Sequence, residues 1–375
     1  MSKRVSRRDF VSQSAIVGGV LGQLGTEGQA ADQAPLAQAA ALEPPEQLIR
    51  RMTTAFQMTQ LLYVAAKLRI ADHLASGPRP VAELAAASGS HADSLYRILR
   101  ALAGFGVFAE EEGQRFSLTP AAALLRSDVP DSLRSTAEVR GEDWMWRSWG
   151  ALIESVKTGK TGFDLVYGKN TFDWFAENPA AARLFDDFQA DLTRRSAAAI
   201  ASAYDFSSAR AIADIGGGTG TLLAAVLERN PNARGILFDL PHVVDAARTR
   251  LPAAISRRCE FVGGDFFKAV PRGADAYLLK YILHDWDNER SRAILGRIRE
   301  AMPASAKLLV VEDLVCGPNV PCDAKLGDVN MLARTGGRNR TEKEYRELLQ
   351  SGGFRLTRVL PARGDLALLE SSAVG

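Results

Sequence analysis

Short apolar segments alternate with helical patterns over the C-terminal half of the chain. Each segment is rich in branched or aromatic residues and has the length of a buried strand. The segments occupy residues 211–215, 234–239, 259–262, 276–279 and 307–312. Strands separated by helices pair in parallel, so this order predicts an α/β fold with a doubly wound sheet. Two further extended stretches, 354–360 and 366–369, predict an edge hairpin that turns at 361–365.

A glycine-rich turn follows the first predicted strand. Residues 213–220 read Ala-Asp-Ile-Gly-Gly-Gly-Thr-Gly, and the missing side chains let a ligand lie against this backbone. A dinucleotide fingerprint requires glycine or alanine where Thr221 stands, whereas the extra glycine is Gly220. The turn therefore favours an adenosyl ligand without a pyrophosphate.

Two carboxylates follow the next predicted strands. Asp239 ends the strand 234–239, where a carboxylate can accept hydrogen bonds from both hydroxyls of a ribose. Asp265 and Phe266 follow the strand 259–262 and suit the exocyclic amine and the face of adenine. A simpler interpretation of Asp265, as a capping residue before a helix, stays open.

The charge balance of the chain disfavours polyanionic partners. The 46 basic and 44 acidic residues give a formal net charge of +2, which the first thirty residues alone supply. Attraction for nucleic acid or anionic lipid depends on summed positive charge, so we expect neither as a partner. Cys259, Cys316 and Cys322 match no zinc pattern with the four histidines, so we expect reduced, structural thiols and no metal.

The N-terminal segment has the pattern of an export signal. Residues 6–11 read Ser-Arg-Arg-Asp-Phe-Val, an apolar stretch follows, and small residues precede Ala30. Residues 1–30 thus resemble a twin-arginine signal, with a basic disordered arm as the alternative. Residues 31–45 are rich in alanine, glutamine and proline and suit a linker. No later segment holds eighteen uninterrupted apolar residues, so we expect no stable membrane span.

Residues 46–140 are predicted to form a helical domain with a winged-helix shape. The expected helices occupy 47–74, 81–86 and 92–103, and the expected extended pairs occupy 107–108 and 116–118. This shape raises a DNA-binding alternative. DNA binding is disfavoured because the second short helix offers few cations and the wing carries three consecutive glutamates.

Residues 141–200 are predicted to be mostly helical. They contain four of the five tryptophans of the chain together with several phenylalanines. Aromatic side chains of this density belong to a core or to the wall of a pocket. We expect this region to close a substrate pocket.

The segment 279–287 adds the motif Leu-Lys-Tyr-Ile-Leu-His-Asp-Trp-Asp. With the glycine-rich turn, Phe-Asp-Leu-Pro around Asp239, Gly-Asp-Phe-Phe around Asp265 and the stretch 336–341, it resembles the small-molecule O-methyltransferases. These are typified by plant caffeic acid, bacterial polyketide and hydroxyneurosporene methyltransferases. The resemblance, from about residue 46 to 375, implies a class I methyltransferase Rossmann-like domain over 201–375 and an N-terminal winged-helix dimerisation domain that forms a homodimer.

The resemblance also implies the cofactor, S-adenosylmethionine, and its contacts. The family's contacts fall on Asp214, Gly216, Gly218 and Gly220 along the methionine end, Asp239 at the ribose, Asp265, Phe266 and Trp286 around adenine, and Lys280 elsewhere in the pocket. The two carboxylates and the turn identified from their positions after strands are thus the same residues that the family uses.

The catalytic base of the family falls on His284. Imidazole is also the side chain whose unperturbed pKa lies nearest neutrality, and His284 follows a predicted strand at the pocket edge. A lone histidine without the other motifs would be interpreted as structural. Glu312 matches a family carboxylate that hydrogen-bonds the imidazole and fixes its tautomer, and Asp285 is expected to contact substrate or hold the loop.

The chain departs from the family pattern at two pocket positions. Asn339 stands where the plant enzymes place a second glutamate beside the base, which lowers the expected basicity of His284. Gln189, close to Phe185, stands where they carry a methionine near the reactive sulfur. The identity of the substrate therefore cannot be taken from the plant enzymes.

The predicted reaction is metal-free methylation of a hydroxyl on an aromatic, polyketide or isoprenoid molecule. Three alternatives stay open: a relative that keeps the cofactor but catalyses hydroxylation or decarboxylation, a winged-helix sensor of an adenosyl ligand, and a secreted binding protein with a vestigial site. Localisation is also open, because S-adenosylmethionine is a cytoplasmic metabolite whereas the N-terminal segment suggests export to the periplasm.

Overall fold

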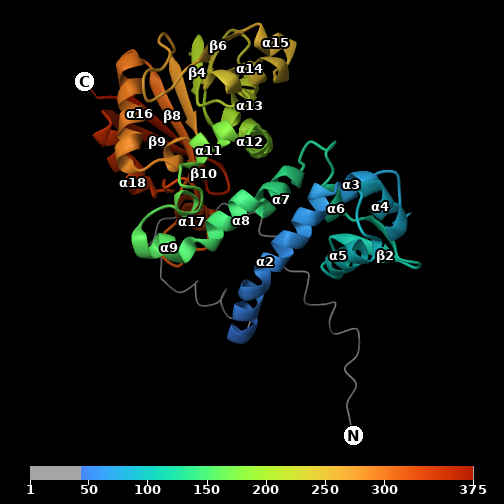
Figure 1. The fold of residues 1–375 in the computed structure, drawn as a ribbon. Helices are drawn as coiled ribbons and strands as arrows, with labels where there is room; N and C mark the ends of the chain where they lie inside the picture. Colours follow the sequence, from blue (N-terminus) through green and yellow to red (C-terminus); the bar gives the residue numbers. More distant parts are fainter. Residues whose placement is uncertain (1–43, 375) are drawn as a thin grey trace, which may run out of the picture. The chain divides into compact units, whose positions relative to one another are not determined.

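A seven-stranded mixed sheet organises the C-terminal half of the computed structural model, which describes residues 44–374 (Figure 1). The export signal predicted at 1–30 and nearly all of the linker predicted at 31–45 lie outside the described residues. The strands, in their order across the sheet, are β6 Cys259–Gly263, β5 Arg234–Asp239, β4 Ala211–Ile215, β7 Ala276–Lys280, β8 Lys307–Asp313, β10 Leu366–Ala373 and β9 Phe354–Arg363. The first five are parallel, so the predicted doubly wound sheet is confirmed.

The last two strands form the predicted antiparallel hairpin at the sheet edge, with β10 paired to both β8 and β9. The turn predicted at 361–365 is too long, because β9 continues through Pro361 to Arg363. Proline lacks an N–H group, and an edge strand tolerates that loss because one side of it has no partner. Only Gly364 and Asp365 are left to turn the chain.

Alternate residues of the sheet strands enter two separate cores, one on each face. Ala213, Ile215 and Tyr277 pack on one face with α16 Asn288–Ala301 and α18 Glu342–Ser351. Ile212, Leu237 and Leu278 pack on the other face. Figure 1 shows α16 and α18 on one side of the sheet and α13 on the other. This period of two explains why the strands are continuously apolar: both faces are buried.

In the described part of the chain, four helices lie on the second face or lead into it, and the first of them connects the preceding region with the sheet. They are α12 Pro179–Ala203, α13 Thr221–Arg229, α14 Pro241–Arg250 and α15 Ala253–Ser256. The 3₁₀ turn η3 Leu283–Asp285 follows β7, and α17 Asp323–Arg334 follows β8. The chain segments that leave the carboxyl ends of the parallel strands thus carry the motifs identified in the sequence.

The N-terminal helical region contains the expected elements with one difference. The helix predicted at 47–74 is two helices, α2 Pro45–Lys67 and α3 Ile70–His73, because Arg69 adopts a left-handed backbone with φ 54°. The other elements are β1 Arg79–Pro80, α4 Val81–Ser88, α5 Ala92–Gly104, β2 Phe108–Glu111, β3 Arg115–Leu118 and α6 Pro120–Ala123. They share a core of their own that includes Leu84, Leu99 and Phe116.

Short helices with an aromatic core lie between these two regions in the sequence. They are α7 Arg134–Gly141, α8 Asp143–Gly150, α9 Leu152–Thr158, α10 Gly162–Tyr167 and α11 Thr171–Glu177, followed by the long α12. Trp144, Phe163 and Phe175 are buried in the core, and Phe185 of α12 packs against Phe175 with ring centroids 5.1 Å apart. The predicted concentration of aromatic residues is thus a packed cluster that α12 extends toward the sheet.

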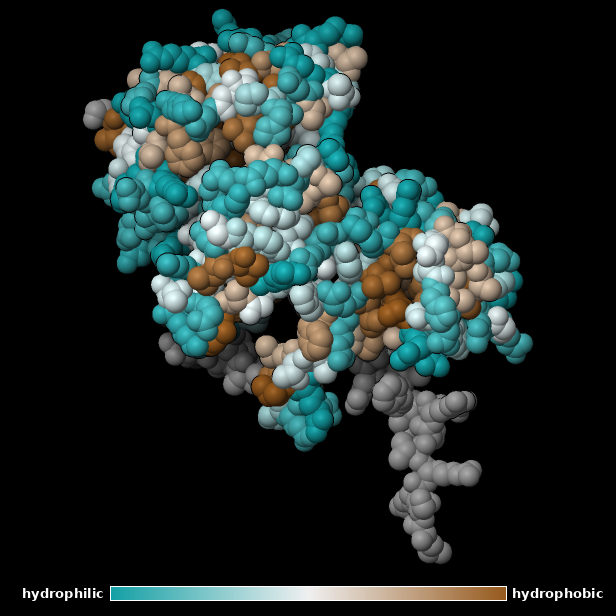
Figure 2. Space-filling view, viewed as in Figure 1, coloured by the Kyte–Doolittle hydropathy of each residue, from teal (hydrophilic) through white to brown (hydrophobic). Residues whose placement is uncertain are grey.

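One side of α2 exposes apolar side chains to solvent in the single chain. Ile49 is 60%, Met52 63% and Phe56 53% exposed, and their spacing places them on one face of the helix. The space-filling view also shows apolar surface over the helical regions (Figure 2). A face of this kind requires an apolar partner surface. Within residues 44–374, no helix has the length and hydropathy needed to cross a membrane.

Candidate active site

The carboxyl ends of β4, β5, β6 and β7 meet at one edge of the sheet, beside a cavity of about 330 Å³. The sequence-predicted residues that line it are Phe185, Gln189, Gly216, Gly218, Asp239, Asp265, Phe266, Lys280, Asp285 and Trp286. An adjoining space of about 70 Å³ is lined by Asp214. Gly220 lies outside both linings and begins α13. The edge where parallel strands end is the usual ligand site of such sheets.

The glycine-rich turn leaves an open backbone surface. Gly216 and Gly218 have φ values of 69° and 56°, in the left-handed region that favours glycine. A Cβ atom on Gly216 would approach Cδ1 of Ile282 to 2.4 Å, whereas a Cβ on Gly218 would meet nothing within 4 Å. The backbone conformation disfavours a side chain at both positions, and the Ile282 side chain adds crowding at Gly216, whereas the peptide at Gly218 stays accessible to a ligand.

Asp239 is anchored by the backbone around it. The N–H of Gly218 donates to its Oδ2 at 2.8 Å, and the N–H of Leu240 donates to its Oδ1 at 2.7 Å. Burial raises the pKa of Asp239 against the opposing effect of these two donors. Each oxygen keeps a second lone pair, so the carboxylate can still accept from a ligand that enters the cavity.

Two further carboxyl groups near the turn, those of Asp214 and Asp186, are buried and have raised pKa values. Burial raises the pKa of Asp214 to about 7, and the charge of Asp239 adds to this effect. Oδ2 of Asp214 is buried without a hydrogen-bond partner among the described residues. Asp186 of α12, which sequence reasoning missed, lines the cavity, and burial and Asp239 raise its pKa to about 6. A ligand that carries positive charge would stabilise the ionised form of these carboxyl groups. S-adenosylmethionine carries a sulfonium group and an ammonium group.

Aromatic rings form the opposite end of the cavity. Trp286 stacks on Phe172 with centroids 5.3 Å apart and meets Phe267 edge to face at 4.9 Å. Asp265 lies beside these rings, and its Oδ1 accepts a hydrogen bond from the N–H of Phe267 at 2.9 Å. Asp265 therefore caps the local backbone, as the simpler interpretation of this residue expects. The cap forms in a turn and not at a helix end. This end of the cavity suits a flat heteroaromatic ring with polar edges.

Lys280 is a buried cation at the end of β7. Its Nζ donates to Oγ1 of Thr193 at 3.0 Å and lies 3.7 Å from the centroid of the Tyr281 ring. Burial lowers the pKa of Lys280 to about 7 against the attraction of Glu312, Asp313 and Asp214. Lys280 thus lies between the glycine-rich turn and the neighbourhood of His284.

His284 is held by a buried carboxylate. Nδ1 lies 3.2 Å from Oε2 of Glu312, and the backbone N–H of His284 donates to Oε1 of the same residue at 3.2 Å. The imidazole also stacks on the ring of Tyr281, 5.1 Å away at an interplanar angle of 5°. If Nδ1 carries the proton that faces Glu312, Nε2 is the nitrogen left to take up a proton.

The electrostatic surroundings keep this imidazole neutral. Burial, together with the nearby charges of Arg334, Lys280 and Arg340, lowers the pKa of His284 to about 3. Burial also raises the pKa of Glu312 to about 8. A neutral imidazole is the form that a general base requires.

Asp285 forms a buried ion pair next to the imidazole. Arg334 donates from Nη2 to Oδ1 of Asp285 at 3.1 Å, and the same oxygen lies 3.8 Å from Nε2 of His284. The guanidinium lies 4.7 Å from the ring centroid of Phe185, and its Nε and Nη1 have no hydrogen-bond partner within residues 44–374. Arg334 was missed in the sequence because it lies far from the motif it contacts.

His284, Glu312 and Asn339 do not themselves line the cavity. Tyr281 and Asp285, which do line it, both approach the imidazole. Asn339 donates from Nδ2 to the carbonyl of Ala324 at 3.0 Å, and its side chain raises the pKa of His284 by a hydrogen bond that burial outweighs. Asn339 is therefore a neighbour of His284 and not a wall of the cavity.

The backbone of residues 284–286 packs directly on Gly337. A Cβ atom there would lie 2.0 Å from the carbonyl oxygen of His284, so the chain has no room for a side chain. We expect Gly337→Ala to displace the His284 segment, to lower kcat about 10-fold and to destabilise the fold by about 2 kcal/mol. Enzyme assay and denaturant unfolding measure both effects. Gly296→Ala, in α16 with nothing within 4 Å of the added Cβ, is the matched control and should keep full activity.

Comparison with known proteins decides the family. Residues 149–355 match the O-methyltransferase domain, and residues 51–128 match the O-methyltransferase dimerisation domain. The chain belongs to the O-methyltransferase family. It is therefore an S-adenosylmethionine-dependent methyltransferase of the type that acts on small molecules at oxygen or nitrogen.

Relatives with both kinds of acceptor are similar over nearly their whole length. A phenazine O-methyltransferase from Lysobacter antibioticus is 45% identical over 88% of this chain and 97% of its own. A phenazine-1-carboxylate N-methyltransferase from Pseudomonas aeruginosa is 33% identical over 80% of this chain and 90% of its own. A crystal structure of an O-methyltransferase from neocarzinostatin biosynthesis, bound to S-adenosylmethionine and 2-hydroxy-5-methyl naphthoic acid, superposes with a TM-score of 0.75 at 31% identity, covering 84% of this chain and 96% of its own.

Proposed function

We propose that this methyltransferase transfers a methyl group to a hydroxyl of a small aromatic molecule, with His284 as the general base. The observation that carries the proposal is the buried, neutral imidazole whose Nδ1 lies 3.2 Å from Glu312. Attack by a hydroxyl requires loss of its proton, whereas an amine or ring nitrogen attacks through a lone pair that it already has. A base at this position is therefore more useful to an O-methyltransferase than to an N-methyltransferase.

The residues of the chain divide the work of the proposed reaction. When bound, S-adenosylmethionine supplies a methyl group that is already activated on a sulfonium. Gly216, Gly218 and Asp239 bind and orient it, and His284 takes the hydroxyl proton at Nε2. In its ionised form Glu312 stabilises the imidazolium that results, because a carboxylate favours the charged form of a neighbouring ring. Most of the rate should come from holding the acceptor oxygen in line with the methyl carbon.

The shape and chemistry of the cavity favour a planar aromatic substrate. Phe172, Phe175 and Phe185 present rings on the side of α11 and α12, and Gln189 offers an amide that can donate to or accept from a substrate. The relatives named above act on, or bind, phenazines and a naphthoic acid. We infer the same general class, fused aromatic rings with a hydroxyl group, for this chain, and action in the cytoplasm, where S-adenosylmethionine is made.

The proposal is tested by comparing matched acceptors. Hydroxylated phenazines or naphthoates and the corresponding amines are offered to the full chain with S-adenosylmethionine, and methylated products are identified by mass spectrometry. We expect transfer to the hydroxyl compounds and at least ~10-fold slower transfer to the amines. Faster methylation of the amines would contradict the assignment of the acceptor atom.

The pH dependence of kcat is expected to lack an inflection near the ordinary histidine pKa of 6.5. His284 stays neutral because its pKa is lowered to about 3, so protonation should not inhibit the base between about pH 8 and about pH 5.5. An acceptor whose hydroxyl stays protonated over this whole range still needs the base and keeps its own titration out of the profile. A fall in kcat near pH 6.5 whose midpoint shifts in Glu312→Gln would contradict this prediction. It would show that the imidazole takes up a proton in that pH range before the reaction begins.

The same pKa values predict opposing effects on stability. Below pH 6.5 the unfolded chain gains a proton on His284 that the folded chain does not bind, so this group makes the fold less stable as the pH falls. The pKa of Glu312 is raised from 4.5 to about 8, so its contribution favours the folded state as the pH falls through that range.

We propose three functional regions with the boundaries predicted above: 46–140 for dimerisation, 141–200 for the substrate pocket and 201–375 for the cofactor. In this division the winged-helix arrangement of 81–118 serves assembly and not DNA binding. The support is the apolar face of α2, where Ile49, Met52 and Phe56 are more than half exposed in the single chain.

The double variant Ile49→Asp, Met52→Asp is expected to convert a homodimer into monomers. A symmetric interface contains each substitution twice, so the dimer should weaken by at least ~1000-fold. Sedimentation velocity of the full chain measures the change. Thr54→Asp, on the opposite side of α2, is the matched control and should leave the dimer intact. An unchanged sedimentation coefficient in the double variant would mean that another surface forms the dimer.

A further inference from the structure

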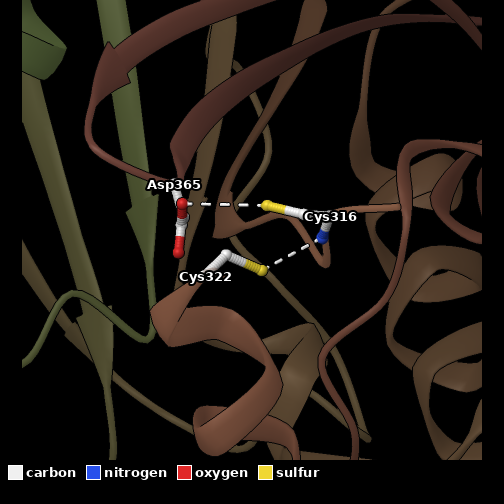
Figure 3. Close-up of side chains that lie close together, drawn as sticks. All are labelled: Cys316, Cys322 and Asp365. Carbon is white, nitrogen blue, oxygen red and sulfur yellow. Dashed lines mark hydrogen bonds between the residues drawn. The ribbon is translucent and has the colours of Figure 1, made fainter. Parts of the chain in front are cut away.

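Two cysteines and one aspartate meet beyond the carboxyl end of β8. Cys316 lies in the loop after β8, Cys322 directly precedes α17, and Asp365 lies in the turn between β9 and β10. Both sulfurs and one carboxylate oxygen lie within 4.8 Å of one another. In Figure 3 the Cys316 sulfur points toward the Asp365 carboxylate, and the Cys322 sulfur points toward the backbone of Cys316. The loop between β8 and α17 and the turn between β9 and β10 thus present metal-ligating atoms to a common space.

We propose that Cys316, Cys322 and Asp365, named the Cys₂Asp cluster, bind a zinc-class divalent metal ion. Tetrahedral zinc holds two thiolate sulfurs about 3.8 Å apart, so small side-chain rotations would bring these atoms into coordination distance. Two thiolates select zinc over the hard cations magnesium and calcium. The spacing of the cysteines alone did not predict this site, because its third ligand comes from a turn far along the sequence.

The hydrogen bonds around the cluster orient its ligand atoms. Asp365 accepts from the N–H of Ala324 at 3.1 Å through Oδ2, which leaves Oδ1 to face the sulfur of Cys316 at 4.0 Å. The N–H of Cys316 donates to the sulfur of Cys322 at 3.2 Å, and an N–H donor of this kind favours the thiolate. Such supporting contacts are characteristic of sites that fix their ligands before the metal arrives.

The surroundings leave room for a fourth ligand. A cavity of about 540 Å³ borders the cluster and is lined by Cys322 and Asp365. Water can therefore complete a tetrahedral shell, as in zinc sites with three protein ligands. The same cavity is lined by two further acids, Asp313 and Asp323, and by two arginines, Arg195 and Arg363. These four charges balance, so the cluster's own thiolates and carboxylate determine its affinity for a cation.

A bound ion would link two segments that also contribute residues to the surroundings of His284. Glu312 lies near the end of β8, just before the loop of Cys316, and Arg334 ends α17, which begins after Cys322. Asp313 accepts from the hydroxyl of Tyr281 at 3.1 Å, and Tyr281 stacks on His284. Metal binding is therefore expected to raise thermal stability first and to change turnover only through these contacts. The proposal does not depend on the acceptor of the methyl group.

Cobalt provides the direct test because its thiolate complexes are coloured. The full chain is reduced with a reagent that contains no thiol and is titrated with Co²⁺ alone. We expect thiolate-to-cobalt charge-transfer absorption, intense visible bands of tetrahedral geometry, one ion per chain, and loss of the bands on addition of Zn²⁺. Cys316→Ser and Cys322→Ser should abolish the sulfur bands, and Asp365→Asn should weaken binding by at least ~10-fold. Cys259→Ser, a thiol in β6 outside the cluster, should bind as the unmodified chain does.

Thermal melting gives an independent readout. Excess Zn²⁺ should raise the melting temperature of the unmodified chain and of Cys259→Ser by about 5 °C, and that of Cys322→Ser not at all. Binding of S-adenosylhomocysteine by every variant checks that each is folded. The proposal is overturned if reduced protein gives no sulfur-to-cobalt bands, or if these bands persist without both cluster cysteines. Isolation of a Cys316–Cys322 disulfide whose reduced form takes up no metal would also overturn it.

Discussion

Replacing His284 with alanine should lower kcat by about 10²- to 10⁴-fold while leaving affinity for S-adenosylhomocysteine unchanged. The loss is large because a hydroxyl must be deprotonated as it attacks, and the nearest acid–base groups, Glu312 and Asp285, are engaged with other partners. Asp285 is paired with Arg334, and the backbone N–H of His284 donates to Glu312. Steady-state kinetics with saturating cofactor and calorimetric titration separate these two effects.

The acceptor used in this experiment gives its control. A pre-ionised hydroxyl or an amine should lose far less rate in His284→Ala, since neither needs the base. His91→Asn, at the start of α5 and far from the cavity, is the matched histidine change and should be as active as the unmodified enzyme. If His284→Ala keeps kcat within about 3-fold on a neutral hydroxyl substrate, the proton leaves by another route and His284 is structural.

The fold was predictable because its signals are local. Each parallel strand is marked by a continuous apolar run such as 307–312, and glycines mark the turn after the first strand. The break at Arg69 was not predictable, since the apolar pattern continues across it into α3. Pro361 predicts the start of the turn, although an edge position lets β9 continue. That error concerns whether a strand neighbour is present, which a linear pattern does not record.

The site was predictable where motifs follow strands, and not where distant segments approach it. Asp239 and Asp265 line the cavity as their positions after strands imply, and Lys280 lines it as the resemblance implies. Arg334 and Asp186 reach the site from α17 and α12, regions without a chemical pattern of their own. Only the burial of these two charged side chains marks them as residues of the site, and burial depends on the tertiary structure. The same holds for Asp365, which is opposite two cysteines only in the folded chain.

Asp239→Ala should weaken binding of S-adenosylhomocysteine by about 100-fold or more. Hydrogen bonds to a charged acceptor contribute about 1.5 to 3 kcal/mol each, and a ribose offers two hydroxyls to this carboxylate. The substitution also frees the N–H groups of Gly218 and Leu240, which now hold the glycine-rich turn against Asp239. Calorimetric titration of the full chain measures the dissociation constant, and circular dichroism confirms that the variant is folded.

Asp239→Asn distinguishes the charge from the shape of this side chain. Both carboxylate oxygens accept a backbone N–H, so an asparagine must place its own NH₂ group against either Gly218 or Leu240. The amide variant should therefore bind nearly as poorly as the alanine variant. Asp245→Ala, an exposed acid of α14 that lies outside the cavity lining, is the matched control and should bind normally.

The result for Asp265→Ala decides whether the two carboxylates have different roles. Oδ1 of Asp265 already accepts from the N–H of Phe267, and a neutral adenine amine would gain only about 1 kcal/mol from the other oxygen. We therefore expect about a 5-fold loss of affinity there, well below that of Asp239→Ala. Equal losses in the two variants would mean that both changes act by unfolding the shared turn region. Normal binding by folded Asp239→Ala would place the ribose elsewhere and leave this carboxylate as a clamp on the glycine-rich turn.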